Sequence, residues 1–238
     1  MNLGYIFVAS YVIFKYQIYN IRPAAIYMTL ALREIALENY VENGNNTMHR
    51  HRLLEGMAHA VAARGYADTT ISDIVREAAV SRRTFYEHFA SKSHCLIALY
   101  EAASLNALNV LRDALDPTRD WEQQVETAIH AYFGCLAQNP MLVRTLFIEI
   151  LGLGSDGLAA RRRVNDQIVG FMLQVINDEG NGDKRTTPLS RDMAMAIVGG
   201  INELVLQAIE RNRVDSLHEL AEPAIQLVRV VTGTASSH

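Results

Sequence analysis

The fold is decided by residues 65–92, which run GYADTTISDIVREAAVSRRTFYEHFASK. Thr70 and Ser81 are good N-cap residues, and each stands just before a short segment whose apolar residues have helical spacing. Asp73 lies three positions after Thr70, where its carboxylate can accept a hydrogen bond from the Thr70 backbone in a capping box. Residues 79–80 separate the two segments. The stretch therefore predicts two short helices joined by a tight turn.

A longer helix precedes this pair, and the last helix of the three has two different faces. Apolar residues recur at helical spacing over residues 48–64, and Gly65 suits the left-handed position that ends a helix. In residues 82–89, Phe85 and Phe89 stand four apart, so both must point inward. The open face of this helix then carries Arg82, Arg83, Thr84, Tyr86 and His88.

An open face of this composition suits the major groove of DNA. The first turn of such a helix reaches base edges, and an arginine fork matches the two acceptors of guanine with a discrimination of about 1–3 kcal/mol. Hydroxyl groups and a tyrosine can hold phosphates and fix the register. Lys92 after Ser91 adds a cation beside the N-terminus of the next helix, where another phosphate can bind. Residues 69–92 are therefore predicted to form a helix-turn-helix DNA reader.

This part of the chain resembles the DNA-binding head of the tetracycline-repressor (TetR) family. The family pattern is RGY-x-x-T-[TS]-[IV]-x-x-I followed by A-G-V-S-x-x-[TS]-[LF]-Y-x-[HY]-F-x-[SN]-K, and nearly every position is matched. Ala79 departs from the pattern, because the family usually has glycine in this turn, so the turn must accommodate a Cβ atom. His94 also departs, since a glutamate often completes the cap of the fourth helix there.

The resemblance implies roles for particular residues. Arg82, Arg83 and Thr84 would face bases or adjacent phosphates. The residues that would hold the DNA backbone are Thr70, Tyr86, His88 and Lys92. Tyr86 has a second interpretation, in which its ring packs between helices. Residues 49–52 (His-Arg-His-Arg) form either a basic arm on DNA or a solvated helix start. The predicted DNA-binding set is Thr69, Thr70, Ser81, Arg82, Arg83, Thr84, Tyr86, His88 and Lys92.

The distribution of charge agrees with a DNA-binding head on an acidic body. The 238 residues carry a net charge of −4, and half of them are apolar, which is ordinary for a soluble globular protein. Residues 48–95 contain seven Lys/Arg and five Asp/Glu, so this segment is +2 and the remainder is −6. This balance argues against a protein that coats nucleic acid through bulk charge. Cys95 and Cys135 are far apart, which predicts free thiols in a reducing compartment.

Residues 1–46 differ from the rest and form an atypical N-terminal extension. Residues 1–14 are uncharged, but Lys15 interrupts the apolar run before it reaches the roughly 20 residues of a membrane-spanning helix. The positive start of a secretory signal is absent. Three interpretations stay open: an accessory helix on the body, a membrane-associating segment, or an upstream start codon with Met28 or Met48 as the true start.

The chain after residue 94 is predicted to be helical, because prolines and glycines separate segments of helical spacing. The expected helices are 95–115, 121–137, 141–151, 158–177, 191–212 and 216–231, with a flexible turn at 152–157 and a polar loop at 177–190. The whole is expected to be all-α. Its units are the extension 1–46, a three-helix helix-turn-helix head at 47–94, and a helical ligand-binding and dimerisation bundle at 95–238.

The resemblance implies a homodimer in which the last two long helices form a four-helix bundle with those of a second copy. Two heads that meet two half-sites one helical turn apart also require a dimer. The residues offered for this contact are Ala194, Ala196, Gly199, Gly200 and Ala208, which allow close approach, and the apolar Leu204, Leu206, Ile209, Leu217, Leu220, Ile225, Leu227 and Val228.

A small-molecule pocket is expected among the middle helices, because apolar walls with a few polar anchors are typical of such pockets. Most of the candidates also have an ordinary core interpretation. Glu149 stands out, since a carboxylate within an apolar helix needs a partner, which a ligand amine, Arg144 or solvent could supply. The predicted lining is His130, Phe133, Met141, Leu146, Phe147, Glu149, Ile150, Phe171, Met172 and Asn202.

An enzyme is the rival class. Glu122, Glu126 and His130 stand four apart on one helix face, but a di-metal bundle needs a second Glu-x-x-His helix that the sequence lacks. No serine-hydrolase, zinc-protease, phosphate-loop or dinucleotide motif is present. We therefore expect no catalytic residue, metal or cofactor. The sequence predicts a cytoplasmic DNA-binding regulator, a repressor released from a palindromic operator by a small apolar ligand. A membrane-tethered sensor that uses residues 1–32 is the other alternative.

Overall fold

The computed structural model describes residues 44–116, 119–177 and 188–233, and every regular element in these ranges is a helix. The head contains α3 (Gly44–Asp68), α4 (Ile71–Glu77) and α5 (Arg82–His88). The body contains α6 (Lys92–Asp113), α7 (Trp121–Ala137), α8 (Pro140–Arg144), the π-helical turn η1 (Thr145–Glu149), α9 (Ile150–Gly152), α10 (Gly154–Ile176), α11 (Arg191–Glu210), the 3₁₀ segment η3 (Val214–Leu220) and α12 (Ala221–Thr232). The all-α prediction is confirmed. Residues 1–43, which hold nearly all of the predicted extension, lie outside the described part.

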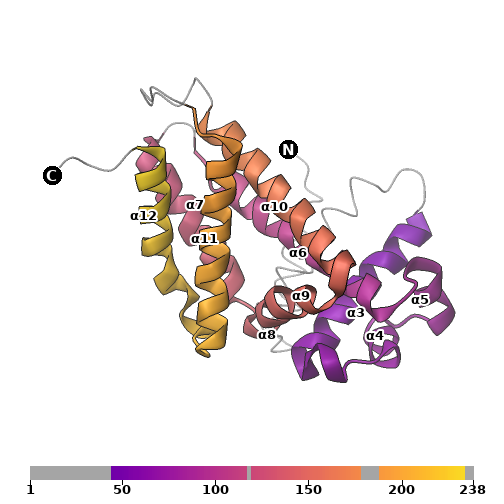
Figure 1. Cartoon of the computed structure of the whole chain (residues 1–238). Coiled ribbons are helices and arrows are strands. Elements are labelled where there is room, and N and C mark those ends of the chain that lie inside the picture. The colour runs from indigo at the N-terminus through magenta and orange to yellow at the C-terminus, as the bar shows by residue number, and fades with distance from the viewer. Residues whose placement is uncertain (1–43, 117–118, 178–187, 234–238) are drawn as a thin grey trace, which may run out of the picture.

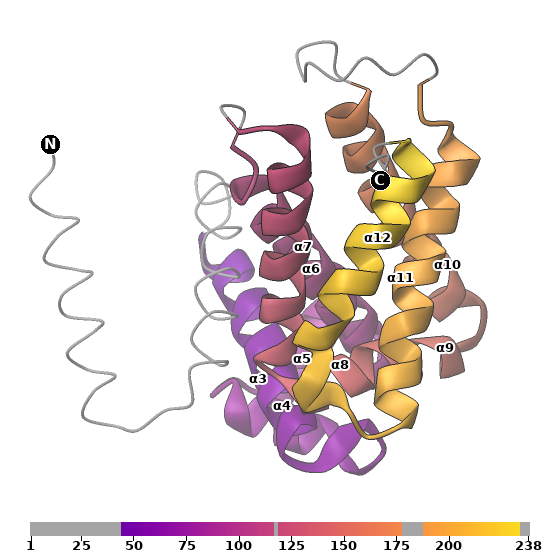
Figure 2. The ribbon, with the colours of Figure 1, turned by 90° about the vertical axis from the view of Figure 1, so that its left-hand side faces the viewer.

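The head and the last two helices lie at opposite ends of the molecule (Figure 1). α6 begins at the head and runs into the body, where it packs against α7 and α10. α11 contacts α10 on one side and α12 on the other, and Figure 2 shows α11 and α12 side by side on one face. α6 and α10 therefore connect the head with the rest of the bundle.

Three predicted boundaries in the body are wrong. The expected helix at 141–151 is divided into α8, η1 and α9. α10 begins at Gly154 (φ 65°) rather than at residue 158, so most of the expected flexible turn is helical. Gly157 is buried where α9 and α10 touch. Only a residue without a side chain fits there, because a Cβ atom would lie 2.1 Å from the Ile150 carbonyl oxygen. The last expected helix begins as η3 and becomes α-helical only at Ala221.

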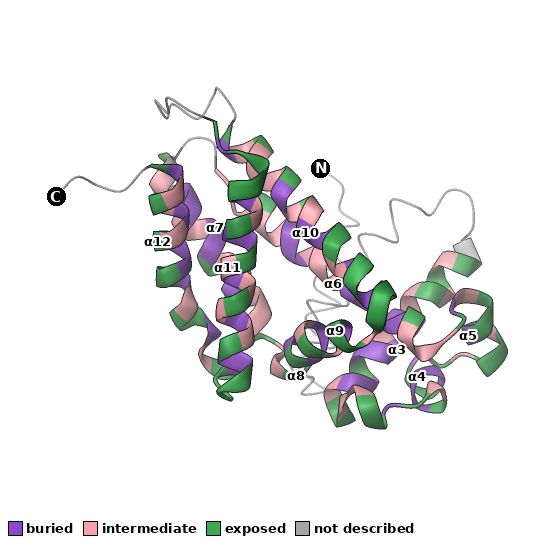
Figure 3. Ribbon diagram, viewed as in Figure 1, coloured by how far each residue is buried: buried purple, intermediate pink, exposed green. Residues whose placement is uncertain are grey.

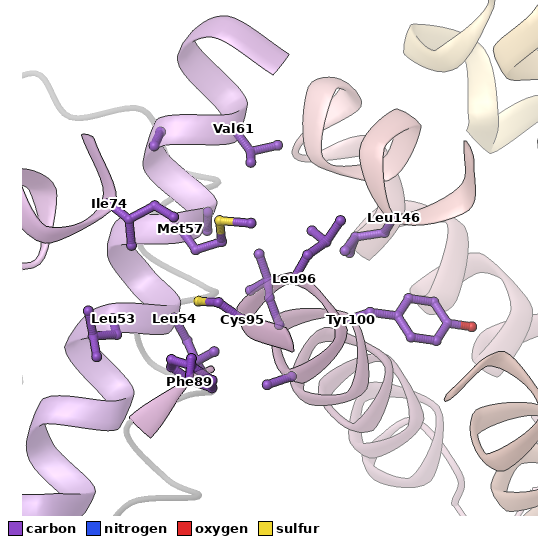
Figure 4. Close-up of a cluster of buried hydrophobic side chains, with 14 of the residues drawn as sticks. Leu53, Leu54, Met57, Val61, Ile74, Phe89, Cys95, Leu96, Tyr100 and Leu146 are labelled. Atoms are coloured by element: carbon purple, nitrogen blue, oxygen red, sulfur yellow. The ribbon is translucent and has the colours of Figure 1, made fainter. Parts of the chain in front are cut away.

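The first of two buried apolar clusters joins the head to the body (Figure 4). Side chains of α3, α4 and α5 meet α6 there, and residues of η1, α9 and α10 complete the cluster. Its members include Leu53, Met57, Ile74, Phe85, Leu96, Leu99, Leu146, Ile150 and Val164. Because this cluster continues across residue 94, the domain boundary at that position stays a prediction.

The second cluster holds the far end of the bundle together. It contains residues of α7, α10, α11, η3 and α12, among them Phe133, Val169, Ile197, Val205 and Ile225. Cys95 and Cys135 are both free. Burial in the first cluster raises the pKa of the Cys95 thiol to about 12, which keeps that thiol protonated and inert.

Candidate nucleic-acid interface and ligand cavity

The start of α4 is fixed by the predicted capping box. The Thr70 backbone N–H donates to Asp73 Oδ2 at 3.0 Å, and the Asp73 N–H donates to Thr70 Oγ1 at 3.2 Å. Arg64 and Arg76 donate to Asp73 Oδ1 at 3.1 and 2.8 Å. The side-chain hydrogen bond from Thr70, followed by that from its backbone and the arginine contacts, lowers the pKa of Asp73 to about 2. Asp73 therefore stays ionised and ties α4 to the end of α3.

The turn between α4 and α5 is tight and strained at one residue. Ala79 adopts φ 49°, in the left-handed region that favours glycine. The Val80 N–H donates to the Val75 carbonyl, and Arg52 of α3 donates to the Ala79 carbonyl at 2.8 Å. These bonds hold the turn against α3, so packing against α3 fixes the angle between α4 and α5.

α5 places one face in the core and leaves the other open (Figure 3). Ser81 Oγ accepts from the Thr84 N–H at 3.0 Å, and Phe85 is fully buried. Arg82 is exposed, and Arg83, whose side chain is 90% exposed, pairs with Glu87 at 3.0 Å. Such a surface pair is worth about 1 kcal/mol or less, so a base or phosphate can replace it. The predicted open face of α5 is present.

The two aromatic members of the predicted DNA-binding set differ in exposure. Tyr86 is 55% exposed, with its ring edge-on to Phe85 at 5.5 Å between centroids, which favours the DNA-facing interpretation over a packed ring. His88 is half-buried and lies edge-on to His49. Burial first, and then the charges of His49 and Arg50, lowers the pKa of His88, so the ring is neutral near pH 7. His88 is therefore a neutral hydrogen-bonding group rather than a cation.

Two members of the predicted set have structural roles. Thr69 is buried, and its hydroxyl donates to the Gly65 carbonyl at 2.7 Å, so its side chain is not presented to DNA. Gly65 has the predicted positive φ (79°), but its ψ of 165° reverses the chain rather than continuing a left-handed turn. Lys92 Nζ donates to the Tyr66 and Thr69 carbonyls, both at 2.9 Å, over the Tyr66 ring. These contacts clamp the loop between α3 and α4, and the expected Lys92–phosphate contact stays a prediction.

Two adjoining cavities, of about 80 and 110 Å³, lie between α6, α7, α10 and α11. Leu146, Phe147, Ile150 and Asn202 line the first, which is nearer the head. Phe171, Met172 and again Asn202 line the second. Both are bounded mainly by apolar side chains. The structure therefore brings together six of the ten predicted lining residues.

The other four predicted lining residues lie elsewhere. His130 and Met141 are exposed, because their positions on α7 and α8 face away from the bundle. Phe133 is fully buried in the second apolar cluster and lines neither cavity. Glu149 is half-buried in η1, near Tyr66 rather than the cavities, and its charge is one cause of the raised pKa of Tyr66 after burial. These four are corrections to the predicted pocket.

The first cavity also has polar side chains, other than Asn202, that were not among the predicted lining residues. Tyr100 and Ser104 of α6, Tyr132 of α7, and Arg161 and Asn165 of α10 all line it. Asn202 Nδ2 donates to Asn165 Oδ1 at 3.4 Å across the α10–α11 contact. Arg161 belongs to an arginine triplet, residues 161–163, whose other two members are exposed. Its place on the inner side of α10 could have been found only by extending the helical spacing of Val164 and Ile168 backwards.

Glu122 and Glu126, which were considered as metal ligands, pair with an arginine instead. Arg229 of α12 donates to Glu126 and lies 3.8 Å from Glu122, so these residues of α7 bind α12. In the described part of the chain, no group of three or more candidate side chains could hold a metal ion.

The outer faces of α11 and α12 are open in this single chain. Among the predicted contact residues, Ala196 and Gly199 are exposed and Leu204, Leu206, Leu220 and Leu227 are partly exposed. Val230, which the sequence analysis did not name, is 63% exposed. Gly200 is also partly exposed. The remaining predicted members are buried in the chain's own second cluster and are therefore core residues: Ala194, Ala208, Ile209, Leu217, Ile225 and Val228.

Comparison with known proteins agrees with the helix-turn-helix head. Residues 53–99 match the family described as bacterial regulatory proteins, tetR family. The DNA-binding head of this chain is therefore similar to that of the tetR family. The match covers the whole of α4 and α5 with most of α3 and the start of α6, which are the elements that form the first apolar cluster.

Two named regulators are similar to longer parts of the chain. The chain is 29% identical to the transcriptional activator FasR of Mycolicibacterium smegmatis over 98 residues, covering 41% of this chain and 45% of FasR. It is 22% identical to the fatty acid metabolism regulator protein of Bacillus subtilis over 181 residues, covering 74% of this chain and 92% of that protein. The chain thus spans less than half of the length of FasR and nearly all of the Bacillus regulator.

Solved structures of two regulators share the fold. FadR of Bacillus halodurans superposes with a TM-score of 0.61 at 19% identity, covering 79% of this chain and 96% of that one. FadR of Bacillus subtilis, solved in complex with stearoyl-CoA, superposes with a TM-score of 0.57 at 16% identity, covering 74% and 96%. At these identities, the likeness establishes the architecture of head and body and nothing finer.

Proposed function

We propose that this protein is a sequence-specific DNA-binding transcriptional regulator that acts as a homodimer on a palindromic operator in the cytoplasm. The observation that carries the proposal is the open face of α5, where Arg82 and Arg83 project from a helix whose other side is fixed by the fully buried Phe85. The match of residues 53–99 to the tetR family supports the same function. The contacts proposed for bases are Arg82, Arg83 and Thr84, and those for the DNA backbone are Thr70, Ser81, Tyr86 and His88.

The dimer is proposed to form through α11 and α12. Their outer faces carry exposed small and apolar residues, among them Ala196, Gly199 and Val230, while their inner faces fill the second cluster. A self-complementary contact there places two heads on one side of the dimer, as two half-sites require. Sedimentation of the full-length protein tests this assembly.

The regulator is proposed to release DNA when a ligand with a long apolar chain enters the two cavities. Their apolar lining and their place along the α6–α10 contact suit an elongated ligand. The names of two relatives, a fatty acid metabolism regulator and a FadR solved with stearoyl-CoA, support a fatty acyl chain. Repression is the proposed mode, although FasR is named an activator.

Binding-site selection from random DNA, followed by titration of variants, tests the proposed function. Arg82→Ala and Arg83→Ala are expected to weaken binding to the selected operator by about 1–3 kcal/mol each, with less effect on unrelated DNA. Arg211→Ala, at an exposed arginine that caps the C-terminal end of α11, is the matched control and should bind like the wild type. All variants should sediment alike. Unchanged sequence preference in both α5 variants would defeat the assignment.

A further inference from the structure

The two cavities adjoin along the contact between α6 and α10, and together they are called the path below. Leu111, Tyr132, Ile168 and Asn202 line both, so the cavities adjoin at these side chains. Arg161 lines the first cavity and Val175 the second, and the fourteen helical steps between them along α10 span about 21 Å at about 1.5 Å per step. The path is long enough for an extended hydrocarbon chain.

The two ends of this path differ in polarity. The far cavity is lined by aliphatic and aromatic side chains, and its polar residues Asn202 and Tyr132 also line the first cavity. The cavity nearer the head contains Tyr100, Ser104, Asn165 and Arg161. Among the described residues that line either cavity, Arg161 carries the one full charge. An occupant with one polar end and one apolar end therefore has a single favourable orientation.

Arg161 is half-buried and has no hydrogen-bond acceptor or carboxylate partner within the described part of the chain. Its neighbour Arg163 differs, since it pairs with Glu101 at 2.6 Å, and Arg162 is exposed to solvent. Tyr100 lies near the guanidinium: burial raises the pKa of this phenol, and the charge of Arg161 opposes that rise. Figure 4 shows the Tyr100 ring directed away from the head cluster and towards the body.

A guanidinium beside an apolar wall gains most from a planar or tetrahedral anion, which can accept two parallel N–H bonds. We propose that Arg161 binds the anionic end of a long-chain ligand whose hydrocarbon tail follows α10 into the far cavity. The anion is the carboxylate of a fatty acid or a phosphate of its coenzyme thioester. This inference rests on the proposed function, because it names the ligand class of the same cavities.

Titration of full-length protein with three probes of equal chain length tests the proposal. The probes are dodecanoate, 1-dodecanol and dodecanoyl-CoA, followed by calorimetry. Arg161→Gln is expected to lower the affinity for the anionic ligand by about tenfold or more while leaving dodecanol within about twofold. Arg161→Lys should recover part of the loss. Arg162→Gln, the exposed neighbour, should change neither affinity.

The outcomes separate the two anion sources and the two proposals. A loss limited to dodecanoate identifies a free carboxylate, and a loss limited to dodecanoyl-CoA identifies the thioester; both support the inference. The inference is overturned if the wild type binds dodecanoate, dodecanoyl-CoA and dodecanol equally. It is also overturned if Arg161→Gln leaves the affinities unchanged, or if no probe binds. Operator affinity without ligand is measured in parallel. If it persists in Arg161→Gln, a failed ligand test leaves DNA binding intact, whereas a wild type that selects no operator defeats the proposed function itself.

Discussion

Ala79 holds a left-handed conformation (φ 49°) in the turn that sets the angle of α5. This conformation costs a non-glycine residue about 1–2 kcal/mol, while glycine loses about 0.5–1 kcal/mol more conformational entropy on folding. Ala79→Gly is therefore expected to stabilise the protein by about 0.5–1 kcal/mol. Ala63→Gly, on the exposed side of α3, should instead cost about 1 kcal/mol. Urea unfolding of both variants checks the difference, and a loss of stability in Ala79→Gly would contradict the strain.

Asp73 makes the stability of the head depend on pH. Its folded pKa, lowered to about 2 by Thr70 and the two arginines, is below its ordinary value of 3.8. A lowered carboxyl pKa contributes stability that is complete above the unfolded pKa and is lost as the pH falls through the folded pKa. The advantage of wild type over Asp73→Asn in melting temperature should therefore shrink between about pH 4 and pH 2. An advantage that stays constant across this range would show that ionisation of Asp73 is irrelevant.

Local chemistry was predictable at the residue scale, whereas tertiary hydrogen bonds were not. The Thr70–Asp73 capping box needs only a spacing of three residues, and it is present. Thr69 and Lys92 lie 23 residues apart, and their contact exists only because α6 returns to the α3–α4 loop. Both residues match the family pattern, but the pattern does not predict that Thr69 is buried or that Lys92 binds backbone carbonyls. For the same reason, Glu149 was wrongly predicted to line the pocket.

At the scale of elements, the crossing of α3 and α4 depends on Gly56. A Cβ atom there would lie 2.6 Å from the Ile74 carbonyl oxygen and 2.8 Å from the Ala78 nitrogen, both backbone atoms that cannot turn away. Gly56→Ala is expected to destabilise the protein by about 1–3 kcal/mol. Gly134→Ala, in α7 with nothing within 4 Å, should gain up to about 1 kcal/mol. Denaturation midpoints that move in the same direction for both variants would contradict this packing.

Which helices exist was predictable, but how they face one another was not. Helical spacing and the prolines placed α7 at its observed bounds. The break at η1 and the helical course of residues 154–157 depend instead on the fit of Gly157 against Ile150, which no local pattern contains. For the same reason Ile209, Ile225 and Val228 could not be assigned to core or dimer contact before the arrangement of α11 and α12 was known.

At the scale of the whole molecule, the cavity and the head share part of their apolar core. Leu146, Ile150 and Val164 belong to the first cluster and also line the first cavity. The cavities, at about 80 and 110 Å³, are small for a long chain, so an occupant must displace some of these side chains. Since packed cores transmit such displacement, the occupant also changes the contacts that hold the head on α6 and α10.

This shared core predicts a reciprocal coupling between ligand and operator. If a ligand lowers operator affinity by a factor within the usual range of about 5–150, operator must lower ligand affinity by the same factor. Leu146→Ala should shrink this factor towards one, because it removes a side chain common to cavity and head. Titrating whichever dodecanoyl ligand binds, with and without operator DNA, measures the factor directly.

Ile209→Ala supplies the control for that measurement. Ile209 is buried in the second cluster and lines neither cavity, so its truncation costs a similar amount of packing without touching the shared core. We expect it to lower stability and keep the coupling factor of the wild type. Equal factors in wild type, Leu146→Ala and Ile209→Ala would mean that ligand and DNA communicate by another route, such as a change at the α11–α12 dimer contact.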